Sequence, residues 1–349
     1  MKIIVDIMGG DRAPEETLKG VCQAVQELNA SYILVGDQRE MERVAAENRL
    51  DIRRFDIVHT DSVITMGDDP LCVVRSKTDS SMAVGLKLLS QGQGDAFVST
   101  GNTGALFTGA TLIVRKIKGI LRAGIGTVIP FQNPVLLLDT GANVTVTEEC
   151  LEQFAVMGAS YMRRMYGIDR PRIGLLNNGA ESCKGTSLQQ AAYLRLSENK
   201  ELNFVGNIEA SAAPFGTCDV LVADGFTGNI FLKSVEGVGK LMLGKLKRVL
   251  YSTPAAKLAA LTLKKPLTAM KKELDPDEHG GAPILGISKP VVKAHGSSDA
   301  RAFKNAIRQA VSYADSDAIY DLAICAKQFA EQKKAEHEAK EQPQEREGD

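Results

Sequence analysis

Residues 135–143 read VLLLDTGAN, four apolar side chains followed at once by a polar turn that contains glycine. Beyond this turn, Thr147 precedes Glu148 and Glu149, a cap residue and two acids that are typical of the first turn of a helix. A run that is apolar on both faces predicts a strand buried on both sides, as in a parallel sheet covered by helices. The fold is built from this unit of strand, polar turn and helix.

The same unit recurs along the chain. Short apolar runs predict strands at residues 3–6, 31–36, 96–99, 135–139, 172–177, 204–207 and 220–224. Amphipathic segments predict helices near residues 14–28, 40–48 and 105–116. We therefore predict an α/β fold with a doubly wound, largely parallel sheet, and we leave the strand order open.

Composition narrows the class of protein. Among 349 residues, 44% are hydrophobic and 24% are charged, and the formal net charge of −1 gives no general attraction to nucleic acid. The six cysteines are scattered without a C-x-x-C pair, which argues against a zinc site and favours free thiols in a reducing compartment. The apolar start is too short for a signal peptide, and no stretch approaches the ~20 apolar residues of a membrane span. We expect a cytoplasmic protein that needs no cofactor and meets the cell membrane only from its inner face.

The chain divides into a large unit and a short tail. We expect one α/β catalytic unit over residues 1–330. Residues 331–349 are nearly all charged or polar and include Pro343. Such a segment buries too little apolar surface to offset its ordering entropy, so we expect a frayed helix or a disordered tail there.

Ligands of an open α/β sheet bind beyond the carboxyl ends of its strands, so the polar turns are the first candidates for a site. The turn Ser99-Thr100-Gly101-Asn102-Thr103-Gly104 has two glycines and opens a helix, which suits close approach of an anion to main-chain amides. The hydroxyls of Ser99 and Thr103 and the amide of Asn102 add donors without charge. We predict a phosphate site on Gly101 to Gly104, and the alternative is a tight turn with local capping bonds.

Two further turns supply carboxylates and amides. Asp139 stands at the tip of a buried strand, with Asn143 four residues later, and either orients a donor and accepts a proton or caps its own turn. Asp224 is a candidate base before a long helix, and Asn229 is a candidate donor. The alternative for Asn229 is the N-cap of that helix.

A fourth turn, residues 177–185, places Glu181 and Lys184 in one loop before a helix. A lysine there can neutralise phosphate or an oxyanion, and one well-placed donor is worth ~3–4 kcal/mol in a transition state. The alternative is a solvated surface ion pair between the two side chains.

His295 is the most suggestive of the four histidines because Lys293 and two hydroxyls flank it. The alternative role of residues 297–299 is to cap the helix that follows. The sequence has no G-x-S-x-G elbow and no readable Ser-His-Asp or Cys-His spacing. These observations favour direct attack by a bound anion over covalent catalysis.

Residues 240–272 form a basic and apolar segment, which we call the hook, with nine basic residues and no Asp or Glu. Leucines at helical spacing, with breaks near Pro254 and Pro266, predict two helices joined at a kink. Such a hook can lie on an anionic bilayer, where each charge contributes ~1 kcal/mol of binding free energy. The alternatives are that the hook binds an acidic partner or forms a homodimer interface. The expected contact residues are Lys257, Leu258, Leu261, Lys264 and Lys265.

With these motifs assembled, the chain resembles the PlsX family of phosphate acyltransferases from Met1 to about residue 325. The motifs that carry the resemblance, in order, lie at residues 5–11 (VDIMGGD), 77–82 (KTDSSM), 101–105 (GNTGA), 139–143 (DTGAN), 224–229 (DGFTGN), 280–283 (GGAP) and 293–300 (KAHGSSDA). Any one of them is weak, but the ordered set is specific.

The resemblance implies a fold similar to that of phosphotransacetylases and of isocitrate- and isopropylmalate-type dehydrogenases, in a homodimer. It also implies acyl carrier protein as donor, inorganic phosphate as acceptor and membrane contact through the hook. Asp6 and position 12 would belong to the substrate site, and Arg12 stands where the family usually has His, so it supplies anion-binding charge. Ala180, and Ala210 with Ser211, are further departures that bear on loop geometry and donor preference.

These observations lead to one mechanistic hypothesis. Phosphate, held on residues 101–104 with Lys184 nearby, attacks the thioester of a long-chain acyl-acyl carrier protein and gives acyl phosphate for phospholipid synthesis. Asn229 or Lys184 steadies the oxyanion, Asp224 or His295 manages protons, and positioning supplies most of the rate. The alternatives are a short-chain phosphotransacetylase that uses acyl-coenzyme A and a non-catalytic membrane scaffold for acyl carrier protein. A nicotinamide-linked dehydrogenase would need a dinucleotide turn that the sequence lacks.

Overall fold

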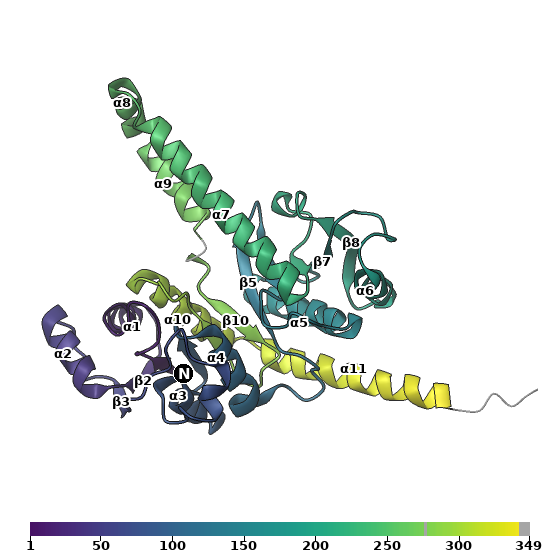
Figure 1. The fold of residues 1–349 in the computed structure, drawn as a ribbon, viewed down its shortest axis with the longest axis horizontal. Coiled ribbons are helices and arrows are strands. Elements are labelled where there is room, and N and C mark those ends of the chain that lie inside the picture. Colours follow the sequence, from purple (N-terminus) through teal and green to yellow (C-terminus); the bar gives the residue numbers. More distant parts are fainter. Residues whose placement is uncertain (276–277, 342–349) are drawn as a thin grey trace, which may run out of the picture.

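An eleven-stranded sheet with helices on both faces forms the centre of the protein in the computed structural model, which describes residues 1–275 and 278–341 (Figure 1). The strands are β1 (Lys2–Asp6), β2 (Ser31–Gly36), β3 (Asp56–His59), β4 (Ala96–Ser99), β5 (Gly124–Pro130), β6 (Pro134–Leu138), β7 (Arg172–Asn177), β8 (Asn203–Glu209), β9 (Val220–Val222), β10 (Ala282–Leu285) and β11 (Val291–Lys293). The α-helices are α1 (Glu15–Glu27), α2 (Gln38–Asn48), α3 (Ser81–Ser90), α4 (Thr103–Gly109), α5 (Glu148–Tyr166), α6 (Ser187–Glu198), α7 (Gly225–Leu250), α8 (Pro254–Thr262), α9 (Lys264–Glu273), α10 (Ala300–Asp315) and α11 (Ala318–Glu341). Shorter helical segments are η1 (Pro70–Val74), the π-helical η2 (Ala110–Arg115) and η3 (Ala213–Phe215).

The sheet consists of two parallel blocks joined by antiparallel pairs, in the order β3-β2-β1-β4-β11-β10-β5-β6-β9-β7-β8. The first block, β3 to β11, is parallel throughout, and so is the second block, β6 to β8. Between them, β10 pairs antiparallel with β11 and β5, and β5 pairs antiparallel with β6. Because of these three successive reversals, the second block runs opposite to the first. The carboxyl ends of the two blocks therefore lie at opposite edges of the sheet.

The predicted α/β class and the largely parallel sheet are confirmed, and all seven predicted strands are present. The strand expected at residues 220–224 is shorter, because β9 ends at Val222 and Asp224 already caps α7. The sequence does not predict β3, β5, β10 and β11. Two glycines and a terminal proline interrupt the apolar run of β5, and β11 has only three residues, so the pattern that marks a strand is weak in both.

Strand residues alternate between two apolar layers. In β6, Leu136 and Leu138 pack in the layer that contains α5, whereas Val135 and Leu137 face the opposite layer. The first block is built in the same way. Burial on both faces explains why the strands read as continuous apolar runs rather than as alternating ones.

The hook, with the part of α7 that leads into it, projects from the second block as a helical arm made of α7, α8 and α9 (Figure 1). The expected break near Pro254 is confirmed, since α8 begins at that residue. The second break lies at Leu263 rather than at Pro266, because Pro266 falls in the first turn of α9, where a missing N–H costs no intrahelical bond. The side chain of Leu258 lies outside the described residues.

The C-terminal segment takes one of the two expected forms. Helix α11 runs from Ala318 to Glu341, so residues 331–341 are helical, as in the frayed-helix alternative, rather than disordered. Residues 342–349 lie outside the described part. Among the helices that the structure describes, none combines the length and the hydrophobicity that a membrane-spanning segment requires.

Close packing of α7 against the turn after β6 gives the first prediction. A Cβ added at Gly228 would lie 2.0 Å from the main-chain oxygen of Asp139. Gly228→Ala should therefore lower the free energy of unfolding by about 1–3 kcal/mol, as measured by urea denaturation. Gly237 in the same helix has open space at this position, so Gly237→Ala should raise it by roughly 0.5–1 kcal/mol. Equal effects of the two substitutions would contradict this packing.

Candidate active site

Three polar turns meet at the carboxyl edge of the second block. Strands β6, β9 and β7 are parallel neighbours, so the turns that follow them lie side by side. These turns cover residues 139–147, 223–229 and 178–186. Of the predicted site residues, this edge brings together Asp139, Asn143, Asp224, Asn229, Glu181 and Lys184.

The carboxylate of Asp139 is the centre of this edge. It is fully buried and accepts hydrogen bonds from the main-chain N–H groups of Ile125, Gly141, Ala142 and Asn143 and from the side-chain amide of Asn143. A buried charge is tolerated when donors of this kind surround it. The structure therefore gives Asp139 the capping role that the sequence left as an alternative, and its oxygens are already engaged.

Two asparagines tie the neighbouring turns together. The Asn143 side chain donates to the main-chain oxygen of Ala123 at 2.7 Å, and its own main-chain oxygen accepts the N–H of Gly225 at 2.8 Å. The exposed Asn229 side chain donates to the main-chain oxygen of Thr140 at 2.8 Å. An amide nitrogen carries two hydrogens, so Asn229 keeps one N–H for a ligand.

Asp224, not Asn229, is the N-cap of α7. Its Oδ1 accepts the main-chain N–H groups of Phe226 and Thr227 at 3.1 and 2.9 Å, and its Oδ2 accepts the Thr227 hydroxyl at 2.7 Å. Both oxygens are engaged in holding the start of the helix. The capping alternative for Asn229 is therefore wrong, and the contacts of Asp224 do not support a role as a base.

Lys184 is the only basic residue in these three turns, and its side chain is exposed. Within the described residues, neither Glu181 nor Lys184 has an ion-pair partner, so the surface ion pair that was the alternative does not form. The loop is held by its main chain instead. The Asn177 side chain donates to the main-chain oxygen of Lys184 at 3.2 Å, and Gly185 takes a left-handed φ of 88°. The main chain of Lys184 is thus fixed at a strand end, and its exposed ammonium forms no ion pair with a carboxylate of the described residues.

Asn207 in β8 lies against the same loop, and we did not predict it as a site residue. Its Nδ2 donates to the main-chain oxygen of Glu181 at 2.8 Å, whereas its buried Oδ1 has no hydrogen-bond partner. Buried polar atoms are nearly always paired, so this acceptor is an exception within the described residues. Nothing in the sequence around an asparagine inside a strand predicts that its side-chain oxygen is buried and unpaired.

A second polar cluster lies at the carboxyl edge of the first block. The Ser99 hydroxyl donates to Oδ2 of Asp6 at 2.6 Å and accepts the N–H of Gly101 at 3.0 Å. Both side chains are buried, and removal from water raises the pKa of Asp6, although hydrogen bonds from Ser99 and Ser81 oppose the shift. The Ser99 hydroxyl is engaged inside the protein, which corrects its expected role as a donor to phosphate.

Lys293 is the buried cation of this cluster. Its ammonium donates to the main-chain oxygens of Thr100, at 3.2 Å, and Ala294. Burial lowers the pKa of Lys293 to about 8, and the charges of Asp11 and Asp6 oppose that shift. The sequence shows only a lysine near His295, because the burial that distinguishes it arises from the pairing of β11 with β4.

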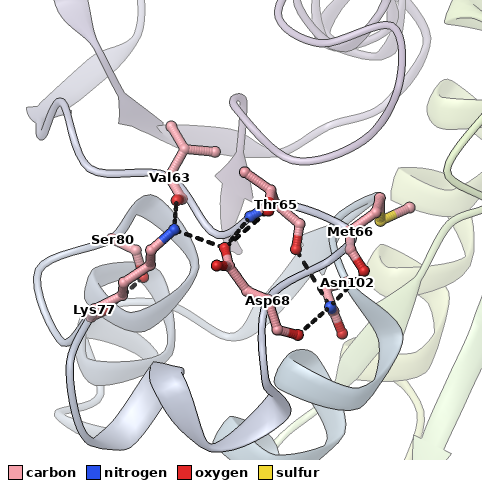
Figure 2. A network of polar contacts seen from close by, with 7 residues as sticks. All are labelled: Val63, Thr65, Met66, Asp68, Lys77, Ser80 and Asn102. Atoms are coloured by element: carbon pink, nitrogen blue, oxygen red, sulfur yellow. Dashed lines mark hydrogen bonds and ion pairs between the residues drawn. The ribbon is translucent and has the colours of Figure 1, made fainter.

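Asn102 fastens the loop before η1 to the start of α4 (Figure 2). Its Oδ1 caps α4, and its Nδ2 donates to the main-chain oxygens of Thr65, Met66 and Asp68 at 3.1–3.3 Å. The Asp68 carboxylate accepts in turn from Lys77 at 2.6 Å. The Asn102 amide is therefore used inside the protein. Its expected role as a phosphate donor is corrected to the capping alternative.

Three other predicted site residues are exposed at this first edge, Arg12 and His295 in loops and Thr103 in the first turn of α4. Nδ1 of His295 lies 2.8 Å from the Ser297 hydroxyl, and Asp299 caps α10, as the alternative for this turn proposed. Within residues 1–275 and 278–341, no three His, Cys, Asp or Glu side chains gather in a way that could hold a metal ion.

The two edges lie far apart. Six strand spacings of ~4.8 Å separate β4 from β7, about 29 Å along the sheet, and the two blocks open at opposite edges. The predicted neighbourhood of Lys184 and a phosphate on residues 101–104 is therefore wrong. The turns resemble one another in composition, and only the strand order shows which of them adjoin.

Comparison with known proteins places this chain in a family. A family model described as "Fatty acid synthesis protein" matches residues 1–320. A protein of Acetivibrio thermocellus named phosphate acyltransferase is 44% identical over 321 residues, which cover 91% of this chain and 94% of that protein. A protein of the same name from Clostridioides difficile is 38% identical over 336 residues, covering 96% and 98% of the two chains.

Solved structures resemble the fold. A phosphotransacetylase from Streptococcus pyogenes gives a TM-score of 0.60 at 17% identity over 90% of this chain and 94% of that chain. The EutD phosphotransacetylase from Staphylococcus aureus gives 0.57 at 18% identity over 89% and 94%. At this level of identity the likeness shows the fold alone. It confirms the expected similarity to phosphotransacetylases.

The buried ammonium of Lys293 gives a prediction on pH. The unfolded chain binds this proton up to pH 10.5, whereas the folded protein binds it only up to about pH 8. Between these values the unfolded state holds more protons, so this group makes stability rise with pH. The unfolding free energy of the parent minus that of Lys293→Met should increase by about 1–3 kcal/mol across this window, as measured by urea denaturation. A difference that stays flat would contradict the burial of a titrating ammonium.

Proposed function

The chain belongs to the fatty acid synthesis protein family and is a phosphate acyltransferase, and we propose that it moves a long-chain acyl group from acyl carrier protein to inorganic phosphate. The acyl phosphate that forms would supply phospholipid synthesis. The observation that carries the proposal is the edge of the second block. There, the Lys184 cation, which forms no ion pair within the described residues, and the remaining N–H of Asn229 stand on turns of the same parallel block.

Phosphate binds at Lys184 in this proposal, rather than on residues 101–104. Lys184 is the only cation among the three turns of the second block, and no carboxylate neutralises it within the described residues. On the first edge, by contrast, the donors of Ser99 and Asn102 are already used.

Acyl transfer then needs no covalent enzyme intermediate. A phosphate oxygen attacks the thioester carbonyl carbon, a C–O bond forms and the C–S bond breaks. The thiolate of the carrier leaves with the electron pair and takes a proton from solvent. The negative charge that develops on the carbonyl oxygen is stabilised by Asn229, whose side chain is held by the main-chain oxygen of Thr140, and by Lys184, whose main chain is held in the Gly185 loop. Binding both substrates at one edge makes the attack effectively unimolecular.

Two other functions give different results in the same assay. A short-chain phosphotransacetylase would prefer acetyl-coenzyme A, and the similarity of the fold to phosphotransacetylases keeps it as the second candidate. A membrane scaffold for acyl carrier protein would bind the carrier without turnover. A series of acyl chain lengths on both carriers separates the three.

The hook is proposed to rest on the anionic inner face of the cell membrane. Leu241, Met242 and Leu261 are each more than half exposed, and Lys264 and Lys265 are exposed without an ion-pair partner among the described residues. Apolar side chains inserted between lipids and lysines at the headgroups would both favour binding. The homodimer that the resemblance implies stays a prediction.

The transfer reaction gives a direct test. With long-chain acyl-acyl carrier protein and phosphate, the parent should form an acyl phosphate that hydroxylamine traps. Lys184→Ala and Asn229→Ala should each lower kcat by about 10²–10³, because each removes a donor to the developing oxyanion. Lys200→Ala changes an exposed lysine in the turn after α6; this variant is the matched control and should keep full activity. Absence of acyl phosphate from the parent would reject the proposal.

Membrane contact is measured by sedimentation with vesicles. The parent should bind vesicles of phosphatidylglycerol and not those of phosphatidylcholine. Reversal of two charges in Lys264→Glu/Lys265→Glu should weaken this binding by more than about tenfold, given ~1 kcal/mol per charge at the surface. Lys200→Glu should leave it unchanged. Equal binding of the parent to both lipids would show that the charges of the hook do not direct it to the membrane.

A further inference from the structure

A basic loop outside the hook joins η2 to β5. Residues 96–138 contain four basic residues and no Asp or Glu, and all four cations lie within residues 115–122. Arg115, Lys118 and Arg122 are exposed, and none of them forms an ion pair within the described residues. We call residues 112–122, which comprise the end of η2 and the connection to β5, the basic loop.

The backbone of the basic loop is held in place by hydrogen bonds to neighbouring segments. The main-chain oxygen of Arg115 accepts the N–H of Ser288 at 2.9 Å, and the N–H of Ile117 donates to Gly286 at 2.9 Å. The Gln153 side chain on α5 accepts the N–H of Leu121 at 2.7 Å. Arg115 takes a left-handed φ of 77°, a conformation that favours glycine, directly after the π-helical η2. The cations are therefore presented on an anchored backbone.

Exposed apolar side chains lie among these charges. Leu112 and Leu121 are 54% and 38% exposed; Leu112 precedes the cations, and Leu121 lies between Lys118 and Arg122. Exposed apolar side chains interspersed with charges are suited to contact with a protein partner. Because every charge here is positive, the complementary partner is acidic.

The basic loop also leads directly into the candidate active site. Ala123 follows it, and its main-chain oxygen accepts the Asn143 side chain at 2.7 Å. Two residues further, the N–H of Ile125 donates to the buried Asp139 carboxylate at 3.1 Å. The turn that bonds to Asn229 through Thr140 thus begins beside this surface. The hook, in contrast, projects away from the body of the protein (Figure 1).

We propose that the basic loop is the docking surface for the acidic carrier protein that delivers the acyl thioester. This inference rests on the proposed function for the nature of the donor, and it assigns carrier and membrane to two different cationic surfaces. Arg115, Lys118 and Arg122 attract the carrier and fix its orientation, while Leu112 and Leu121 contact its apolar residues. The thioester then enters the edge of the second block next to Asn143.

The test compares two charge reversals of equal size. Lys118→Glu/Arg122→Glu changes exposed side chains and leaves Arg115, with its special backbone conformation, in place. We expect this variant to raise both the Kd for the acyl carrier protein and the KM for its acyl form by about tenfold or more, with kcat little changed. The KM for acyl-pantetheine, a donor without the acidic protein, should stay the same. The steep salt dependence of kcat/KM with the carrier should also flatten in the variant.

The hook variant Lys264→Glu/Lys265→Glu is the matched control, and it should keep the carrier Kd within about twofold of the parent. An unchanged carrier Kd in Lys118→Glu/Arg122→Glu would overturn the inference, while acyl phosphate formation by the parent would still uphold the proposed function. Lost vesicle binding or a changed oligomeric state, with carrier binding intact, would assign the loop to a membrane or to a second copy and would equally overturn it. Because the Kd for the carrier is measured by direct binding, the test does not depend on catalytic turnover.

Discussion

The buried carboxylate of Asp139 is the contact on which the second block depends. A charge without water is stable only when donors surround it, and here they come from a neighbouring strand and from the turn itself. The bond from Ile125 ties β5 to the end of β6, and the bonds from Asn143 carry the connection on to Gly225 at the start of α7. One group therefore sets the positions of a strand, a turn and the helix that bears Asn229.

The reversal between the blocks gives the two edges different properties. On the first edge, hydrogen bonds within the protein engage the side chains of Asp6, Ser99 and Lys293. The side chain of Asn102 is engaged in the same way. These contacts stabilise the turns and leave few free donors. On the second edge, the main chain satisfies the local groups, so the Lys184 ammonium remains open to an anion. For this reason, the second edge is consistent with a reaction of bound phosphate.

Much of the fold could be predicted because it depends on local patterns. Continuous apolar runs such as residues 135–138 mark strands buried on both faces, and Thr147 marks a helix start in sequence and structure alike. The strands that escaped prediction, β5 and β11 among them, are short or interrupted and become strands only through pairing with distant segments. Residue type likewise identified the candidate turns. It could not show that hydrogen bonds within the protein occupy the side-chain amide of Asn102, whereas the amide of Asn229 keeps one N–H available.

By itself, then, the sequence determined the α/β class, the polar turns at strand ends, the basic hook and the resemblance to a family of acyltransferases. These features depend on periodicity, residue type and order along the chain. Only the tertiary structure decided which turns share an edge, that Lys184 stands far from residues 101–104, and that Lys293 is buried. Strand order and burial arise from contacts between residues distant in sequence, and no local pattern encodes which hydrogen bonds a side chain has left to offer.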